Sequence, residues 1–213
     1  MTTAHRDERG PRARCSTSTA ACLLLALGLA ACGGDGSNPV GNPPEVSNPV
    51  GVVGQKLSFA YFQKCINPIF VARLQINIGG VISTNTCAGS GCHDNTTGTG
   101  GALRVVANAQ PVDLSDPANT PEVIRTTDMY KNFYSAQGSV VIGAVTQSRL
   151  LTKPLVLNVL HGGGLIFEDL NDPNARLMQY WMTHPAPNGQ DEFSTATYSM
   201  FTPANLSGTC NVQ

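Results

Sequence analysis

The stretch Cys87-Ala88-Gly89-Ser90-Gly91-Cys92-His93 places two cysteines and a histidine within seven residues. Two thiols followed directly by an imidazole match the arrangement that carries a covalent c-type haem, in which the cysteines form thioether bonds to the two vinyl groups and the histidine ligates the iron. The usual spacing has two residues between the cysteines, whereas this sequence has four. The extra residues must loop outward, and the glycines among them permit this. The motif therefore predicts one haem c held by Cys87, Cys92 and His93.

Two other interpretations of the same residues stay open. In an oxidising compartment Cys87 and Cys92 can form a local disulfide, which would leave His93 as an ordinary surface residue. A zinc site is the third interpretation, although it needs a fourth ligand that the sequence does not show nearby. The rest of the chain has to discriminate between them.

The N-terminus predicts export. Residues 1–19 contain four arginines, and the apolar run Ala20–Ala31 is too short to span a bilayer as a mature helix. The run ends in Leu29-Ala30-Ala31-Cys32, which resembles the lipobox of bacterial lipoproteins. That resemblance implies a signal peptide over 1–31, a lipid on Cys32 and a place in the cell envelope, with the outer membrane favoured because glycine follows the cysteine. An ordinary signal peptide is the alternative.

Residues 32–52 predict a solvated linker, because two near-repeats rich in asparagine, proline and glycine, at 37–41 and 47–51, cannot bury a core. We predict a single domain over 53–213, since this length suits one core but not two. From Gly33 onward there are 9 Lys and Arg against 12 Asp and Glu, a formal charge of −3. The absence of a basic stripe argues against a nucleic-acid partner.

Three helices are predicted in this domain. Apolar residues repeat at helical spacing over Leu57–Val71, with a kink or an early end at Pro68. A second helix, starting at Thr120 and Pro121, includes Met129. A third begins after Asp172, a suitable N-cap.

The ordered motifs resemble a family of small cytochrome-c-like domains from exported bacterial proteins, of the kind abundant in planctomycetes. The resemblance covers roughly Leu57–Thr183, and its motifs follow one another in the family's order: Pro68-Ile69-Phe70, Cys87 to His93, Gly100 to Arg104, Ser148-Arg149-Leu150-Leu151, His161-Gly162-Gly163-Gly164 and Tyr180-Trp181-Met182. It implies a mainly α, cytochrome-c-like fold with long loops. The sequence also allows a short strand pair near Leu103–Ala107 and Val140–Val145.

The resemblance also suggests the second axial ligand of the iron. Many members carry a Met-Pro pair in the distal-ligand loop, whereas this chain has His161 in about that place. We therefore expect His93 and His161 as the axial pair, with a surface histidine in a glycine-rich turn as the alternative for His161. The other candidates are assigned to packing or to solvated positions: Met129, Met178, Met182, Met200 and His184.

Cys65 and Cys210 then remain, and an oxidising compartment favours a disulfide between them. With both axial positions filled by protein, we expect an electron carrier rather than an enzyme, working with a redox partner protein of the envelope. Two alternatives remain: a haem-free lipoprotein stapled by Cys87–Cys92 and Cys65–Cys210, which binds another envelope component, and a haem enzyme such as a peroxidase, in which His161 is displaced.

Overall fold

The computed structural model describes residues 54–213. The predicted signal peptide (1–31), the lipid-bearing Cys32 and the predicted linker (32–52) lie outside the described residues. In the part that is described, no helix is both long enough and apolar enough to cross a bilayer.

The first helical segment has three parts: α1 (Phe59–Tyr61), the π-helical turn η2 (Phe62–Ile66) and α2 (Asn67–Val71). The Ser58 hydroxyl caps its start by accepting a hydrogen bond from the Tyr61 N–H at 3.1 Å. Pro68 lies in the first turn of α2, directly after η2; it has no N–H to donate to the preceding turn, yet the helical backbone continues to Val71. The helix predicted over this stretch is therefore present, and Pro68 does not end it.

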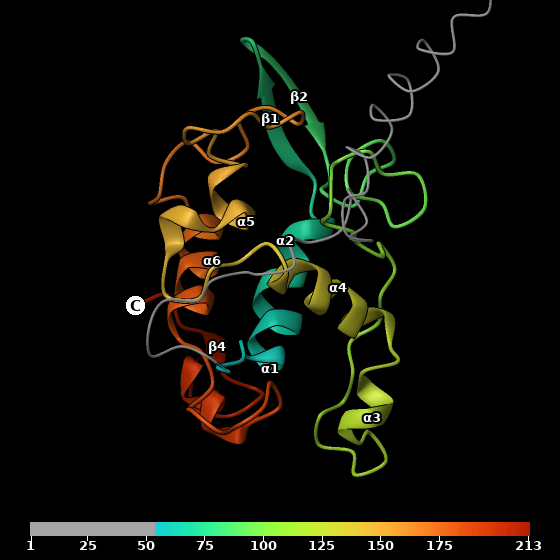
Figure 1. The fold of residues 1–213 in the computed structure, drawn as a ribbon, viewed down its shortest axis with the longest axis vertical. Helices are drawn as coiled ribbons and strands as arrows, with labels where there is room; N and C mark the ends of the chain where they lie inside the picture. Colours follow the sequence, from blue (N-terminus) through green and yellow to red (C-terminus); the bar gives the residue numbers. More distant parts are fainter. Residues whose placement is uncertain (1–53) are drawn as a thin grey trace, which may run out of the picture. The chain divides into compact units, whose positions relative to one another are not determined.

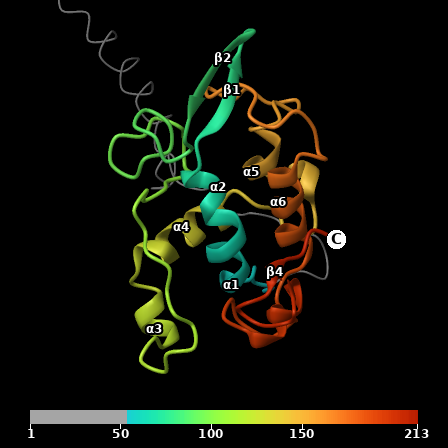
Figure 2. The ribbon, with the colours of Figure 1, turned by 180° about the vertical axis from the view of Figure 1, so that it is seen from behind.

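A β-hairpin follows, formed by the antiparallel strands β1 (Leu74–Ile78) and β2 (Val81–Asn85). The two residues between them, Gly79 and Gly80, have φ values of +60° and +90°, as a two-residue hairpin turn requires. In Figures 1 and 2 this hairpin lies at one end of the described residues and α3 at the other. The hairpin was not among the elements predicted from the sequence.

The middle of the chain contains short helices separated by long loops: α3 (Pro121–Ile124), α4 (Asp128–Gln137), the 3-10 turn η3 (Val145–Gln147) and α5 (Arg149–Thr152). Thr120 caps α3, and Thr127 accepts a hydrogen bond from the Tyr130 N–H and starts α4. The single helix predicted from Thr120 is thus two helices, because Thr127 provides a second cap.

The C-terminal part contains α6 (Pro173–Thr183), the 3-10 helix η4 (Thr195–Met200) and the two-residue strands β3 (Phe201–Thr202) and β4 (Thr209–Cys210). Asp172 caps α6 by accepting hydrogen bonds from the N–H groups of Asn174 and Ala175, as predicted. The disulfide Cys65–Cys210 is present and joins η2 to β4.

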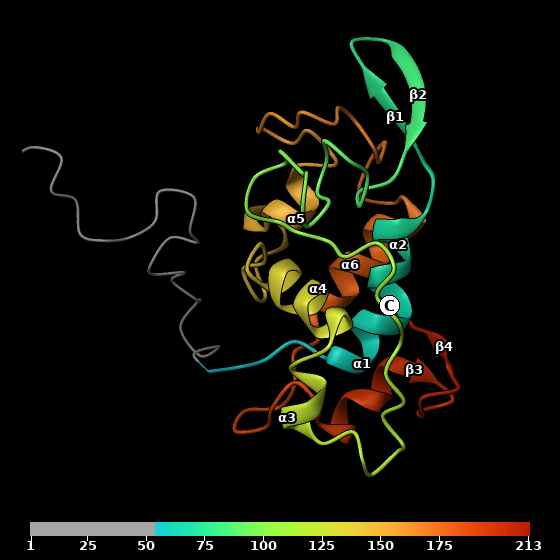
Figure 3. The same ribbon diagram turned by 90° about the vertical axis from the view of Figure 1, so that its right-hand side faces the viewer.

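The core is an aromatic cluster where η2, α4 and α6 meet (Figure 3). The buried Phe62 ring lies 5.4 Å from Trp181, 5.5 Å from Phe133 and 6.0 Å from Phe70, measured between centroids. The Trp181 indole N–H donates to the Ser58 carbonyl at 2.9 Å, so its polar atom is satisfied. The core therefore holds one face of α6 against the first helical segment.

The predicted mainly α fold is wrong. The described chain is only 32% helical and contains two small antiparallel sheets, β1–β2 and β3–β4. The predicted strand pair is wrong as well: Val105 forms only a single parallel bridge with Asp94, and Val145 begins a 3-10 turn. Helical content is low because caps and glycine turns divide the chain into short elements.

Candidate functional site

The segment from Cys87 to His93 follows β2 directly and folds back on itself. The His93 N–H donates to the Cys87 carbonyl at 2.9 Å, and the Cys92 N–H donates to the Gly89 carbonyl at 2.9 Å. The Ala88 N–H donates to the Phe70 carbonyl at 3.0 Å, which ties the loop to the end of α2. The four residues between the cysteines thus form an outward loop whose two ends are held together.

Backbone contacts on both sides hold the His93 ring. Its Nδ1 lies 3.2 Å from the Leu103 carbonyl, and the His93 carbonyl accepts from the Val105 N–H at 2.7 Å. A Cβ at position 100 would lie 2.7 Å from the His93 ring, so only glycine at this position leaves room for the ring. The glycine-rich stretch after the motif therefore positions His93.

His161 is held from the opposite side, by a loop that the hairpin supports. Its Nδ1 lies 2.7 Å from the Gly164 carbonyl. The next residue, Leu165, exchanges two backbone hydrogen bonds of 2.9 Å with Asn77 of β1. Gly164 has φ +72°, and a Cβ there would overlap the Asn77 carbonyl oxygen. The hairpin, which was not predicted from the sequence, is thus what places His161.

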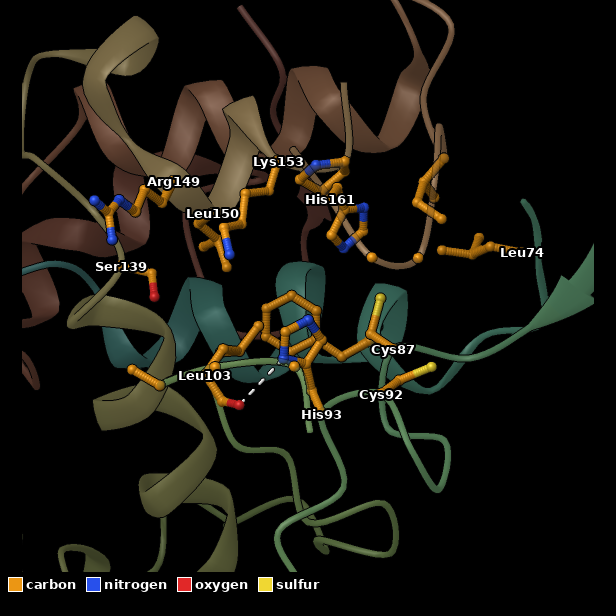
Figure 4. A pocket seen from close by; sticks show the side chains of 18 of the residues that line it. Leu74, Cys87, Cys92, His93, Leu103, Ser139, Arg149, Leu150, Lys153 and His161 are labelled. Atoms are coloured by element: carbon orange, nitrogen blue, oxygen red, sulfur yellow. Dashed lines mark hydrogen bonds between the residues drawn. The ribbon is translucent and has the colours of Figure 1, made fainter. Parts of the chain in front are cut away.

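The two imidazoles face each other across a cavity (Figure 4). Their ring centroids are 6.4 Å apart and their planes are inclined by 16°. A carbonyl oxygen can only accept a hydrogen bond, so Nδ1 carries the proton in both rings and each Nε2 keeps its lone pair. The structure thus brings together the two histidines that were paired from the sequence.

Burial disfavours the charged form of both imidazoles. It lowers the pKa of His93 and of His161 below the ordinary 6.5, against the opposing effect of the hydrogen bonds to Leu103 and Gly164. A neutral imidazole whose Nδ1–H is held by a carbonyl is the form in which histidine ligates a metal through Nε2.

The cavity has a volume of about 690 Å³ and a mostly apolar wall. Apolar side chains from all parts of the domain line it: Phe70, Leu74, Leu103, Leu150, Ile166 and Met178. Cys87, Cys92, His93 and His161 line it as well, so the four predicted cofactor-binding residues share one cavity. Among the described residues, no group of three or more His, Cys, Asp or Glu side chains is arranged to hold a bare metal ion.

Cys87 and Cys92 are not bonded to each other in the structure. Burial, reinforced by the neighbouring Cys92, raises the pKa of the Cys87 thiol to about 11. Cys92 accepts a weak hydrogen bond from the Asn85 amide at 3.7 Å. Both thiols thus face the cavity as unpaired groups, and Cys87 stays protonated at neutral pH.

The other ligand candidates are engaged elsewhere. Met129 and Met182 are buried in the core, and Met178 is buried where the core meets the cavity wall. Met200, predicted in a polar tail, is also buried. The ring of His184 stacks on Tyr180 with 3.8 Å between centroids, away from the residues that line the cavity.

Two cations on the cavity wall, Arg149 and Lys153, were not assigned a role from the sequence. Arg149 directly follows Ser148, the N-cap of α5, and Lys153 lies four residues further on. This spacing was the available signal, because it puts both side chains on the same face of a helical turn.

Comparisons with protein-family models, curated proteins and solved structures found no match to this chain. The resemblance to cytochrome-c-like domains therefore rests on the motif residues and their order, and the function has to be argued from the cavity.

Proposed function

We propose that this protein is an envelope-tethered electron-transfer protein that carries one covalent haem c. The observation that supports it is the opposed pair of neutral imidazoles, 6.4 Å apart, beside two unpaired thiols in an apolar cavity. When bound, the haem supplies a one-electron Fe(III)/Fe(II) couple.

The separation of the two rings fits a metal between their Nε2 atoms. Two metal–imidazole bonds of about 2 Å plus the two ring radii come to roughly 6 Å, close to the observed 6.4 Å. The hydrogen bonds of the Nδ1 atoms restrain each ring at the cavity wall and leave its Nε2 free of a partner among the described residues.

Each proposed residue has its own task. The Cys87 and Cys92 thiols would hold the haem covalently through thioether bonds, formed by addition of each S–H to a vinyl group without an oxidant. His93 and His161 would hold its iron through their imidazoles. The mostly apolar wall would shield the cofactor from water and hold its orientation.

The cellular setting belongs to the same proposal. Export by the signal peptide and a lipid on Cys32, followed by the linker over 32–52, would hold the domain at the bacterial envelope, with the outer membrane favoured. A redox protein of the envelope is the partner that such a carrier needs.

The test is an absorbance spectrum, with an in-gel haem stain after denaturation, on full-length protein exported beside a haem-attachment system. Covalent haem with low-spin reduced bands is expected, and a Cys87→Ser/Cys92→Ser variant should lose the stain. Colourless, folded wild-type protein from a system that loads a control cytochrome would reject the proposal and favour the haem-free, disulfide-stapled lipoprotein. High-spin iron with peroxide turnover would instead favour a haem enzyme.

A further inference from the structure

The charged side chains on the cavity wall are of one sign. Arg149 and Lys153 line the cavity, whereas no aspartate or glutamate of residues 54–213 does. Neither side chain forms a hydrogen bond or an ion pair within residues 54–213, although the surface cation Lys131 pairs with Asp128 at 2.7 Å. Arg149 is exposed and Lys153 half-buried, so both are free to pair with a negatively charged group on a ligand in the cavity.

The position of the two cations is as informative as their charge. Figure 4 shows Arg149 and Lys153 on the side of the cavity away from Cys87 and Cys92. The cations therefore lie along the cavity that the two histidines span, opposite the thiols.

The two edges of a haem differ in charge, as the two sides of the cavity do. Its vinyl groups, which the thiols would take, and its two carboxylates lie on opposite edges of the macrocycle. We infer that Arg149 and Lys153 hold these two carboxylates and so fix the orientation in which the macrocycle enters the cavity. This inference rests on the proposed function.

The two cations differ in what they offer. The guanidinium of Arg149 can bind a carboxylate with two parallel hydrogen bonds, whereas the ammonium of Lys153 acts as a point charge that swings on a flexible stem. The hydroxyl of Ser139 lies on the same side of the cavity (Figure 4) and adds a neutral hydrogen-bond donor. Together they form a polar edge on an otherwise apolar cavity.

The test compares reduction potentials of full-length, haem-loaded Arg149→Gln, Lys153→Gln and double variants. Loss of a cation beside the carboxylates favours the more positively charged ferric form, so each single variant should lower the equilibrium constant for reduction about threefold to tenfold. The double variant should show a larger drop and less haem per protein. Arg149→Lys should restore most of the potential, because it keeps the charge.

The matched control is Lys131→Gln, which removes a cation from the exposed face of α4. The inference would be overturned if the double variant kept its covalent haem and low-spin bands and had the same reduction potential as this control. That result would leave the proposed function intact. Wild-type protein without haem would overturn both. If the double variant does not fold, the two single variants and Arg149→Lys decide the question.

Discussion

At the scale of single residues, the orientation of the His161 ring depends on its hydrogen-bond acceptor more than on the position of His161 in the sequence. The Gly164 carbonyl holds its Nδ1 at 2.7 Å, and Gly164 can lie there only because it has no side chain. A histidine in a glycine-rich loop would otherwise turn freely in solvent. The three glycines are visible in the sequence, but their partner Asn77 lies in a distant hairpin and is not.

We expect His161→Ala to keep the covalent haem and to lose the low-spin spectrum, because Cys87 and Cys92 still attach the cofactor while the sixth position opens. The oxidised absorbance spectrum measures this directly. His184→Ala is the matched control, since His184 stacks on Tyr180 outside the cavity. If His161→Ala keeps the low-spin spectrum, and His93→Ala is the only single histidine variant that loses it, His161 is not a ligand.

We expect Gly164→Ala to destabilise the protein and Gly162→Ala to have little effect. At φ +72° an alanine costs about 1–2 kcal/mol in backbone strain, and its Cβ would also lie 2.7 Å from the Ile78 side chain. Gly162 has nothing within 4 Å of a Cβ and no positive φ; its substitution should change the free energy of unfolding by less than about 0.5 kcal/mol. Urea unfolding checks both values, and equal values would contradict the role of Gly164.

At the scale of elements, local signals are predictive where one residue decides the geometry. Asp172 caps α6 as expected from its place before Pro173. The Gly79-Gly80 pair after the alternating stretch Leu74–Ile78 is an equally local signal, although the hairpin was not predicted. The π-helical turn η2 could not be predicted, because it arises from packing of the first segment against α4 and α6 and leaves no mark in residue spacing.

Glu192 provides an element-scale link between α3, α4 and the segment after α6. Its carboxylate accepts hydrogen bonds from Arg125 at 3.0 and 3.1 Å and from the Tyr130 hydroxyl at 2.8 Å. Burial alone would raise the pKa of Glu192, but the hydrogen bonds and the Arg125 charge outweigh it, so the pKa lies below the ordinary 4.5. The ionised carboxylate therefore stabilises these elements.

We expect Glu192→Gln to lower the free energy of unfolding at pH 7 by about 1.5–3 kcal/mol, the range for hydrogen bonds to a charged group. Because the folded pKa is lowered, the stabilisation is present above about pH 4.5 and is lost as the pH falls through the folded value. The difference between variant and wild type should thus shrink in acid. Asp128→Asn, which breaks the exposed pair with Lys131, is the control and should change little at either pH. A pH-independent difference would contradict the assignment.

At the scale of the whole molecule, the candidate site is more predictable than the fold. Residue type and spacing alone group Cys87, Cys92 and His93, and the resemblance to cytochrome-c-like domains adds His161. The arrangement of short helices and small sheets depends instead on long-range contacts, such as that of Trp181 with the Ser58 carbonyl, which no local pattern encodes. The mainly α prediction failed for this reason.

The Cys65–Cys210 disulfide acts on the whole described chain, because it joins residues 145 positions apart. Closing a loop of this length removes so much freedom from the unfolded chain that the bond should contribute about 5 kcal/mol in the chain-entropy model. In a domain of this size that corresponds to a melting temperature about 10–20 °C higher. We expect Cys65→Ser/Cys210→Ser to lose this stability, as measured by thermal unfolding. Reductant should lower the melting temperature of the wild type and leave that of the double variant unchanged. A double variant as stable as the oxidised wild type would show that the short elements are held by the aromatic core around Phe62 without help from the staple.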